Sequence, residues 1–418
     1  MNVYLVGGAV RDRLLDIESA ERDWVVVGAR AEDLLAQGFK PVGKDFPVFL
    51  HPETREEYAL ARTERKVDKG YHGFVFHADP TVTLAEDLKR RDLTINAMAM
   101  TPGGEIIDPY GGREDLEAGR LRHVSDAFRE DPVRILRVAR FAARFAHRGF
   151  RVSHATQRLM REMVAAGEVD ALVPERVWKE TQRALEEPTP SRFFEVMRSC
   201  GALARLFPEI DRLFGVPQPS QHHPEVDTGV HVMMVLEQAA RLSADARVRF
   251  AALLHDLGKG ETPVADWPRH KGHEQRSLAL VRGVCDRLRV PGDYCDLANM
   301  VAEHHGRFRR VGDVPEAEPV VRFLEELDAF RRPERFDRFL LACEADLRGR
   351  RGFEEKDFSQ PADFRRALAA ANEVKASAVM ASGARGPEIR TALHAERVAA
   401  VRPLFEDREL PSRRGPGA

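Results

Sequence analysis

The sequence has few cysteines, no long apolar run and no internal repeat. Its four cysteines, Cys200, Cys285, Cys295 and Cys343, are widely spaced and form no C-x-x-C pair. This spacing predicts free, buried thiols rather than disulfides. No run approaches the ~18 apolar residues that a membrane span requires, and no basic region precedes an apolar stretch near the N-terminus. We therefore expect a cytoplasmic protein with no membrane partner.

The bulk composition fits a globular protein of more than one domain. Hydrophobic residues make up 43% and charged residues 32% of the chain, proportions that are typical of globular proteins. A chain of 418 residues is too long for one hydrophobic core of ordinary size. The formal net charge of −2 does not by itself predict a nucleic-acid partner, because the distribution of charge matters more than its sum.

The first segment with a recognisable chemistry is a strand, a glycine pair and a helix. Val3 to Val6 is an apolar run that predicts a buried strand, and Val10 to Leu15 has a helical pattern. Between them, Gly7-Gly8 brings backbone N–H groups and a helix N-terminus close to a phosphate, since no Cβ is in the way. Arg11 follows, where its guanidinium can hold phosphate oxygens.

Two carboxylates come next. Glu21 and Asp23 lead into Trp24 to Val27, which predicts a second strand. Residues two apart on a strand point to the same side, so both carboxylates would project beside the glycine turn. Mg²⁺ prefers oxygen ligands that are shared between the protein and substrate phosphates. The alternative from these residues alone is a pair of solvated acids at the start of a strand.

Further strands are expected before residue 62. Phe46 to Leu50 and Tyr58 to Ala61 have strand patterns. Between them, Glu56 and Glu57 are candidates for a third acid near the metal ions.

Two further segments of this region allow local predictions. Arg62 to Phe76 is charged and contains glycine, which predicts a flexible loop. Arg90 to Ala97 has the pattern of a helix start. Arg90-Arg91-Asp92 at that start fits either a solvated helix cap with Arg–Asp pairing or a contact to phosphate.

From Pro132 to about residue 215 the periodicity is helical, with Pro188-Thr189-Pro190 as a breaker. Between Arg134 and Arg161 there are eight arginines and no Asp or Glu. Solvated helix faces usually mix both signs of charge, so this run favours a polyanion partner. The spacing of three residues places Arg134, Arg137 and Arg140 along one slowly turning face.

Four segments together resemble the bacterial class II tRNA nucleotidyltransferases, the CCA-adding enzymes. In chain order they are Leu5 to Asp12, Glu21 to Asp23, Arg90 to Ala97 and Glu130 to Phe141. The resemblance implies a mostly α, α+β fold, in which a polymerase-β-like head with a small mixed sheet precedes an all-α remainder. It also implies template-independent addition of CCA to the 3′ end of tRNA from CTP and ATP, with Mg²⁺ as cofactor.

The resemblance implies roles for particular residues. Glu21 and Asp23 would bind two Mg²⁺ ions at the catalytic centre; the family usually has Asp-x-Asp here, and Glu21 keeps the charge and both oxygens. Asp131 and Arg134 would select the base, because Asp accepts from the exocyclic amine that cytosine and adenine share, and Arg donates to ring acceptors. The implied nucleotide-binding residues are Gly8, Arg11, Arg91, Asp131, Arg134, Arg137 and Arg140.

A second set, His231, His255-Asp256 and Asp346, has the order H…HD…D of the HD phosphohydrolase superfamily. Imidazoles and carboxylates that converge from separate helices make a metal site, and such a metal ion lowers the pKa of bound water. The alternative is a pair of core histidines, but burying His255-Asp256 in an apolar helix without a metal ion is costly.

The HD residues narrow the resemblance to the multifunctional CCA form of the family. That form implies phosphatase, 2′-nucleotidase and 2′,3′-cyclic phosphodiesterase activities, with Ni²⁺ as the preferred metal. Spacing alone indicates only a hydrolase that uses a divalent metal ion. Four other histidines are candidate supporting or substrate-binding groups that the sequence does not rank: His270, His273, His304 and His305.

We expect four parts: a nucleotidyltransferase head (1–140), a helical neck and RNA-binding region (141–215), an HD domain (216–350), and a helical tail with a disordered end (351–418). The proline-rich run Val216 to Pro224 predicts a boundary. The expected partners are tRNA, CTP and ATP, and the expected assembly is a monomer or a homodimer.

Two other functions stay open at this point. A bacterial poly(A) polymerase shares the head and resembles this chain near Gly43 to Phe46, but such proteins carry a second basic residue where Asp45 stands. They also lack the HD half as a rule. The other alternative is an HD hydrolase whose head is an inactive tRNA-binding module, which only Glu21 supports.

Overall fold

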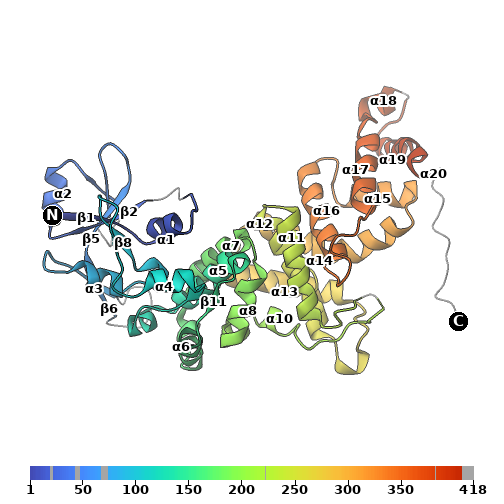
Figure 1. Cartoon of the computed structure of the whole chain (residues 1–418). Helices are drawn as coiled ribbons and strands as arrows, with labels where there is room; N and C mark the ends of the chain where they lie inside the picture. The colour runs from blue at the N-terminus through green and yellow to red at the C-terminus, as the bar shows by residue number, and fades with distance from the viewer. Residues whose placement is uncertain (19–21, 43–47, 67–73, 222, 382, 407–418) are drawn as a thin grey trace. The chain divides into compact units, whose positions relative to one another are not determined.

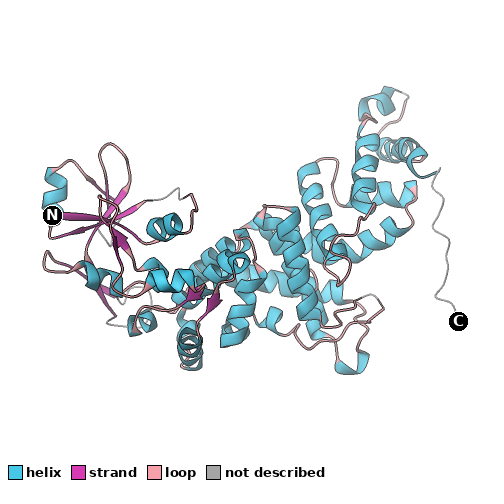
Figure 2. Ribbon diagram, viewed as in Figure 1, coloured by secondary structure: helices cyan, strands magenta, loops and turns pink. Residues whose placement is uncertain are grey.

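The computed structural model describes residues 1–18, 22–42, 48–66, 74–221, 223–381 and 383–406. Its internal contacts divide the chain into two compact units, Met1–Pro208 and Glu209–Ala418. Figure 1 traces the elements of each unit, and Figure 2 shows that the drawn strands belong to the first of them. The expected mostly α, α+β fold is confirmed, while the finer division into four parts stays a prediction.

The first unit is built on a mixed sheet. Within the described residues its strand order is β3-β4-β5-β2-β1-β8-β9. The β2–β5 pair is parallel and the other neighbours are antiparallel. The strands are β1 (Asn2–Val6), β2 (Asp23–Val27), β3 (Lys40–Val42), β4 (Val48–Leu50), β5 (Glu57–Leu60), β8 (Ala99–Met100) and β9 (Ile106–Ile107).

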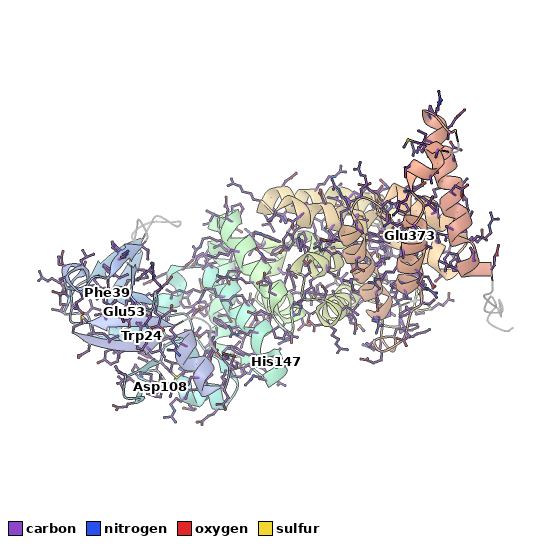
Figure 3. All side chains as sticks on the ribbon, turned by 90° about the horizontal axis from the view of Figure 1, so that it is seen from above. Trp24, Phe39, Glu53, Asp108, His147 and Glu373 are labelled. Carbon is purple, nitrogen blue, oxygen red and sulfur yellow. The ribbon has the colours of Figure 1, made fainter. Side chains whose placement is uncertain are left out.

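Successive residues of β2 face two different hydrophobic cores, as the alternation of a strand requires. Val25 packs with Val6 and Leu88 on one face of the sheet. Val26 packs with Leu34 and Phe49 on the other. Trp24, on the Val26 side, stacks on Tyr58 with ring centroids 5.7 Å apart; it is labelled in Figure 3. Asp23 therefore lies on the Val25 face.

The expectation of a loop over Arg62 to Phe76 is wrong where the structure describes it. Strands β6 (Arg62–Lys66) and β7 (Phe74–Ala78) pair antiparallel as a separate two-stranded ribbon; residues 67–73 lie outside the described residues. Antiparallel ladders are held by backbone hydrogen bonds, so a charged composition does not prevent them. The aromatic and β-branched residues at 74–76 were the strand signal.

The expected helix start at Arg90 is also wrong, because a helix ends there. Helix α3 (Leu84–Lys89) begins at Thr83, whose side chain forms a capping box with Glu86. Asp92 then accepts hydrogen bonds from the Leu93 N–H (2.8 Å) and the Asn96 side chain (3.0 Å). Such local bonds compete with the helix, and only the short 3₁₀ turn η1 (Thr94–Asn96) follows.

The helical prediction after Pro132 is confirmed except at the two-residue strand β11 (Arg151–Val152). Helix α5 (Val133–Phe145) packs against α7 (Pro174–Glu186) and α8 (Ser191–Cys200). The expected breaker lies between the last two. The other elements of this unit are α1 (Gly8–Leu14), α2 (Ala31–Ala36), α4 (Gly112–Glu117), β10 (Arg120–Leu121), β11 (Arg151–Val152), α6 (His154–Ala165) and α9 (Ala202–Leu206).

The centre of the second unit is formed by α11 (Thr228–Leu242), α12 (Ala246–Leu254), α13 (His273–Leu288), α14 (Gly292–Asp313) and α16 (Pro333–Arg348). Helix α12 packs against α11, α14 and α16. The other helices are α10 (Pro208–Asp211), α15 (Ala317–Glu326), α17 (Gln360–Asn372), α18 (Ala376–Ala381), α19 (Pro387–Val401) and α20 (Pro403–Glu406).

The cysteines form no disulfide among the described residues. All four cysteines are free thiols; three are buried, and Cys295 is half-buried. Among the described residues, no helix combines the length and the apolar character needed to cross a bilayer. The predicted disordered end, Arg413 to Ala418, lies outside the described residues.

A close backbone contact at Gly258 gives a first testable prediction. A Cβ there would lie 2.1 Å from the His273 carbonyl oxygen and 2.6 Å from the Ser277 nitrogen. We expect Gly258→Ala to lower the free energy of unfolding by roughly 1–3 kcal/mol or more, because α13 must shift. The exposed Gly283 has open space around its Cβ position, so Gly283→Ala is the control and should raise stability by about 0.5–1 kcal/mol. Calorimetric unfolding tests both variants. An unfolding temperature of Gly258→Ala equal to that of the parent would contradict the packing argument.

Candidate functional sites

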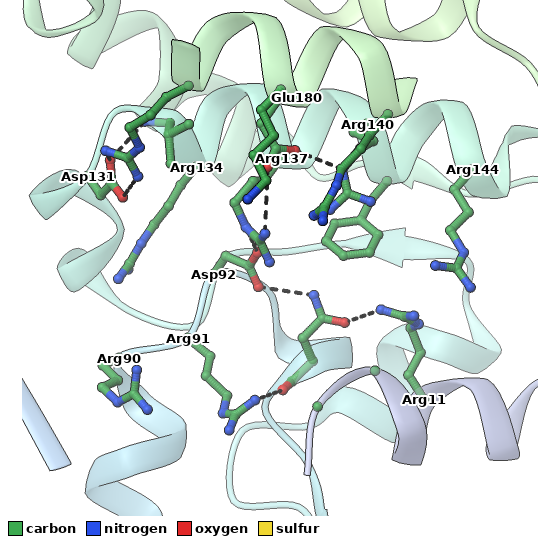
Figure 4. A pocket seen from close by; sticks show the side chains of 18 of the residues that line it. Arg11, Arg90, Arg91, Asp92, Asp131, Arg134, Arg137, Arg140, Arg144 and Glu180 are labelled. Carbon is green, nitrogen blue, oxygen red and sulfur yellow. Dashed lines mark hydrogen bonds and ion pairs between the residues drawn. The ribbon is translucent and has the colours of Figure 1, made fainter. Parts of the chain in front are cut away.

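A cleft of about 770 Å³ in the first unit joins the glycine turn, Asp23 and a row of arginines. Figure 4 shows the arginine side chains of this cleft converging from several elements. Glu21 lies outside the described residues. All the other residues predicted for this site line the cleft: Gly8, Arg11, Asp23, Arg91, Asp131, Arg134, Arg137 and Arg140.

The glycine turn is fixed beside Asp23 by the sheet. Val6, the last residue of β1, pairs with Asp23 of β2, and the Gly7 N–H donates to the Met98 carbonyl (3.2 Å). Gly7 has φ +69° and ψ −128°, a conformation that disfavours residues with a Cβ. A Cβ there would also lie 2.7 Å from Nη1 of Arg91. Glycine at this position is therefore required by both conformation and space.

Glu57 is the acid that lies beside Asp23. The two residues are register partners on the parallel strands β5 and β2, so their exposed side chains point to the same face. Glu56 instead accepts a hydrogen bond from the Trp24 indole (2.9 Å) and lies 3.6 Å from Arg22. Of the two candidates for a third acid, Glu57 thus has the better position, and a pair of adjacent carboxylates suits a hard divalent cation.

Arg11 is held in place before any ligand arrives. Its side chain is 3% exposed, and it donates to Asp12 (2.8 Å) and to the Asn96 side-chain oxygen. Its guanidinium lies over the rings of Phe141 (5.1 Å) and Phe145 (5.2 Å). Burial lowers the pKa of Arg11 while Asp12 opposes this effect, so the arginine is a desolvated cation with one carboxylate partner.

Buried carboxylates position the arginines of α5. Arg137 donates to Asp92 (2.7 Å), and Arg140 donates to Glu180 of α7 (2.8 Å). Burial raises the pKa of Asp92, but Arg137 and the Asn96 hydrogen bond outweigh it and hold the pKa well below the usual range. The pKa of Arg137 is raised, chiefly by Asp92. These pairs keep the arginines charged and oriented along the cleft.

Asp131 and Arg134, the predicted base-selecting pair, sit on the same side of the cleft (Figure 4). Both Asp131 oxygens accept from Arg176 of α7 (3.1 and 2.6 Å). Arg134 donates to the Ala127 carbonyl (2.8 Å). The sequence did not identify Arg176 and Glu180 as cleft residues. Their spacing of four on an amphipathic helix was the available signal.

The four predicted metal ligands of the second unit meet in one buried cluster. His231 Nε2 lies 3.2 Å from Asp346 Oδ1 and 3.9 Å from Asp256 Oδ2. His255 Nε2 lies 3.1 Å from Asp256 Oδ2 and 3.7 Å from Asp346 Oδ1. The histidines are at most 1% exposed. They come from α11 and from the end of α12, and Asp346 comes from the last turn of α16.

The hydrogen bonds of these imidazoles favour a cation between them and the acids. His231 Nδ1 lies 3.0 Å from the Gly349 carbonyl, and His255 Nδ1 lies 2.7 Å from the Ala252 carbonyl. A carbonyl only accepts, so each Nδ1 carries a proton and the Nε2 lone pair faces carboxylate oxygens. His255 Nε2 and Asp256 Oδ1 are buried with no hydrogen-bond partner among the described residues. A divalent metal ion would satisfy both.

The pKa of His231 reflects the same need for positive charge. Burial lowers the pKa of His231, but hydrogen bonding with Asp346 and with Glu225 outweighs burial and raises it. Glu225 Oε1 lies 3.0 Å from Nδ1 of His231. Such a carboxylate behind a histidine is the usual support of a metal ligand, because it orients the ring and increases its basicity.

The structure ranks the histidines that the sequence left unranked. His273 Nε2 and His305 Nε2 lie 3.3 and 3.5 Å from Asp256 Oδ1, so both belong to the cluster. Burial lowers the pKa of His305 to about 4, which keeps it neutral and able to bind a metal ion. His270 uses both ring nitrogens within the protein, on Thr262 and Pro217. His304 contacts Glu303 and Phe323 instead.

Comparison with known families defines the class of this protein. Residues 3–122 match the family described as "Poly A polymerase head domain", and residues 149–214 match "Probable RNA and SrmB- binding site of polymerase A". Residues 228–332 match the "HD domain" family. The fold and the sites thus define a nucleotidyltransferase with a polymerase-type head followed by an HD-type hydrolase domain. Both domain types imply dependence on divalent metal ions.

Relatives identify the family. The chain is 64% identical to the multifunctional CCA protein of Thioalkalivibrio sulfidiphilus over 97% of this chain and 98% of the relative. It is 58% identical to that of Alkalilimnicola ehrlichii over 98% of this chain and 99% of the relative. The chain therefore belongs to the multifunctional CCA protein family.

Solved structures confirm the fold. A CCA-adding enzyme in complex with ATP has a TM-score of 0.64 at 22% identity, covering 96% of this chain and 86% of that one. The Thermotoga maritima CCA-adding enzyme complexed with tRNA has a TM-score of 0.60 at 20% identity, covering 98% and 89%. At such identities the likeness concerns the fold alone.

The depressed pKa of Asp92 predicts a pH-dependent contribution to stability. Because its pKa is lower in the folded than in the unfolded chain, this contribution is present above about pH 4 and is lost as pH falls further. We expect Asp92→Asn to lower the free energy of unfolding by about 1–3 kcal/mol at pH 7, because the ion pair with Arg137 is lost. Solvent limits this effect, since Arg137 is 34% exposed. Urea unfolding between pH 3 and 7 should show the difference from the parent shrinking toward low pH. The exposed Glu105→Gln is the control; a constant difference for Asp92→Asn would contradict the pairing.

Proposed function

We propose that the first unit adds and repairs the 3′-terminal CCA of tRNA, using CTP and ATP. The observation that supports this most is the single cleft shared by the glycine turn, Asp23 and the arginines of α5. A triphosphate needs N–H donors, cationic side chains and metal-binding carboxylates within one site. The relatives with this head are named multifunctional CCA proteins.

The proposed reaction is an in-line displacement at the α-phosphorus. The 3′-hydroxyl oxygen of the RNA forms a bond to the α-phosphorus of CTP or ATP and gives up its proton to water. The bond from that phosphorus to the oxygen bridging the α and β phosphates breaks, and pyrophosphate leaves. Arg11 and the Gly7-Gly8 backbone lie on one side of the cleft, and Arg137 and Arg140 lie on the side of α5. Catalysis then rests mainly on placement and charge neutralisation of the triphosphate.

Mg²⁺ is the proposed cation of this cleft. Asp23, Glu57 and, from the family pattern, Glu21 would hold it through hard oxygen ligands. When bound, Mg²⁺ neutralises charge on the triphosphate and stabilises attacking and leaving oxygens.

Base selection is assigned to Asp131 and Arg134. Arg176 donates hydrogen bonds to both oxygens of Asp131, which holds the carboxylate in one orientation. An ionised Asp accepts from the exocyclic amine of cytosine or adenine, whereas the uracil carbonyl at that position would repel it. Rejection of a base that leaves buried polar groups unpaired is stronger than rejection by size alone.

The second unit is proposed to hydrolyse phosphate esters, including 2′,3′-cyclic phosphates, 2′-nucleotides and simple monoesters. The Nε2 atoms of His231 and His255 face Asp256 and Asp346 across a buried space that suits a divalent cation. The nitrogen-rich ligand set favours a borderline transition metal such as Ni²⁺ over Mg²⁺. When bound, the metal supplies an activated water and polarises the phosphoryl group. Lys259 Nζ lies 2.6 Å from Asp256 Oδ2 and helps to keep that carboxylate ionised.

Asp23→Ala tests the transferase. We expect at least about a thousandfold loss of nucleotide addition, since a metal ligand supports several kcal/mol of transition-state stabilisation. Hydrolysis should persist, because the two sites use different residues. Incorporation of labelled CTP and ATP into tRNA lacking CCA measures the loss, with the exposed Glu32→Ala as control. Undiminished incorporation by Asp23→Ala would reject the assignment.

The same assay separates the alternatives in the parent protein. Ordered incorporation of C, C and A supports CCA addition. Incorporation of A alone without a length limit would instead indicate a poly(A) polymerase. Intact hydrolysis with no incorporation would indicate an inactive head that only binds tRNA.

His255→Ala tests the hydrolase. We expect at least about a hundredfold loss of p-nitrophenyl phosphate hydrolysis in Ni²⁺-loaded protein, because a buried metal ligand is removed. CCA addition should be unchanged. His304→Ala is the matched control, since His304 adjoins His305 in sequence but lies outside the cluster. Retained hydrolysis in His255→Ala would overturn the HD assignment.

A further inference from the structure

The segment after α16 contacts two residues of the proposed metal centre. The Gly349 carbonyl accepts a hydrogen bond from His231 Nδ1 (3.0 Å), and the Arg351 backbone N–H donates to Glu225 (3.3 Å). Glu225 in turn supports His231. Arg350, between these two backbone contacts, is thus fixed beside the centre by its own main chain.

Arg350 is a buried cation without a direct acidic partner. Arg350 is only 5% exposed, and its side-chain Nε is buried without a hydrogen-bond partner among the described residues. Across the described residues no side-chain hydrogen bond or ion pair of Arg350 is present; its guanidinium lies 5.4 Å from the Phe353 ring centroid. Asp346, Glu225 and Asp313 act on it only through longer-range electrostatics. Arginine is rarely buried in this way unless it is paired.

Arg309 supplies a second guanidinium, on the helix that carries His305. Arg309 on α14 follows His305 by four residues, so it extends the same helix face by one turn. Burial and the positive charge of Arg309 both lower the pKa of Arg350. Within the described part of the chain Arg309 also lacks a hydrogen bond or ion pair of its side chain. Two cations that repel each other beside a metal centre would be stabilised by a shared anion.

We propose that Arg350, assisted by Arg309, binds the phosphoryl oxygens of the substrate hydrolysed at the HD centre. The ligand class is the phosphate group of a ribonucleotide, either a monoester dianion or a 2′,3′-cyclic monoanion. The planar guanidinium of Arg350 matches two phosphate oxygens, and the Phe353 ring keeps it oriented. This assignment rests on the proposed hydrolase function.

The experiment uses the full chain loaded with Ni²⁺. Calorimetry measures the affinity for Ni²⁺ and then for inorganic phosphate, and steady-state kinetics give KM and kcat for 2′,3′-cyclic AMP. For Arg350→Met we expect about 10- to 100-fold weaker phosphate binding and a similar rise in KM, as the loss of charge-assisted hydrogen bonds implies. Ni²⁺ affinity should be unchanged. Arg350→Lys keeps the positive charge but loses the planar guanidinium. Its phosphate affinity and KM should therefore lie between those of the parent and of Arg350→Met.

Matched variants separate this role from a structural one. Arg351→Met removes an exposed guanidinium one residue along and should bind phosphate like the parent. Arg309→Met should weaken phosphate binding to a smaller extent, and it serves as the test if Arg350→Met does not fold. Parent-like phosphate affinity in Arg350→Met, or an equal loss of Ni²⁺ affinity, would overturn the proposal. Failure of the parent itself to bind Ni²⁺ or to hydrolyse the substrate would instead reject the hydrolase function.

Discussion

The pairing of buried guanidiniums with buried carboxylates is the constraint on which the nucleotide cleft depends. An unpaired charge removed from water is costly, so arginines can line a desolvated cleft only if acids from elsewhere in the fold hold them. Asp12 supplies this support from the residue next to Arg11, while Asp92 and Glu180 supply it to the arginines of α5 from distant parts of the chain. Their common effect is to fix the arginines before a triphosphate binds, which reduces the ordering that binding would otherwise require.

The metal-binding cluster of the second unit has the opposite charge balance. There, carboxylates and imidazole lone pairs point at one another, and the missing component is positive charge. Backbone carbonyls that occupy the Nδ1 protons of His231 and His255 enforce this arrangement. The chain therefore has one site with an excess of positive charge, which suits a polyanion. It has a second site rich in carboxylates and imidazole lone pairs, which suits a metal ion.

The sequence predicted those parts of the sites that are local in the chain. The Gly7-Gly8 turn, Arg11 and the arginines of α5 follow from short-range pattern, and each lines the cleft. The partners Glu180 and Arg176 could not be predicted, because their roles arise only when α7 packs on α5. The error at Arg90 has a local origin instead: side-chain hydrogen bonds of Asp92 to the Leu93 N–H and to Asn96 compete with the helix that the pattern predicts to begin there.

The position of β1 in the sheet limits which part of the cleft can move. This strand has hydrogen-bonded neighbours on both sides, β2 and β8, and its last residues Leu5 and Val6 are buried. Interior strands of this kind exchange their amide hydrogens only when a large part of a domain opens. The floor that carries the glycine turn is consequently rigid on the timescale of turnover. Admission of a nucleotide and departure of pyrophosphate must then rely on side chains and on the helices around the rim, such as α7, rather than on the strand beneath.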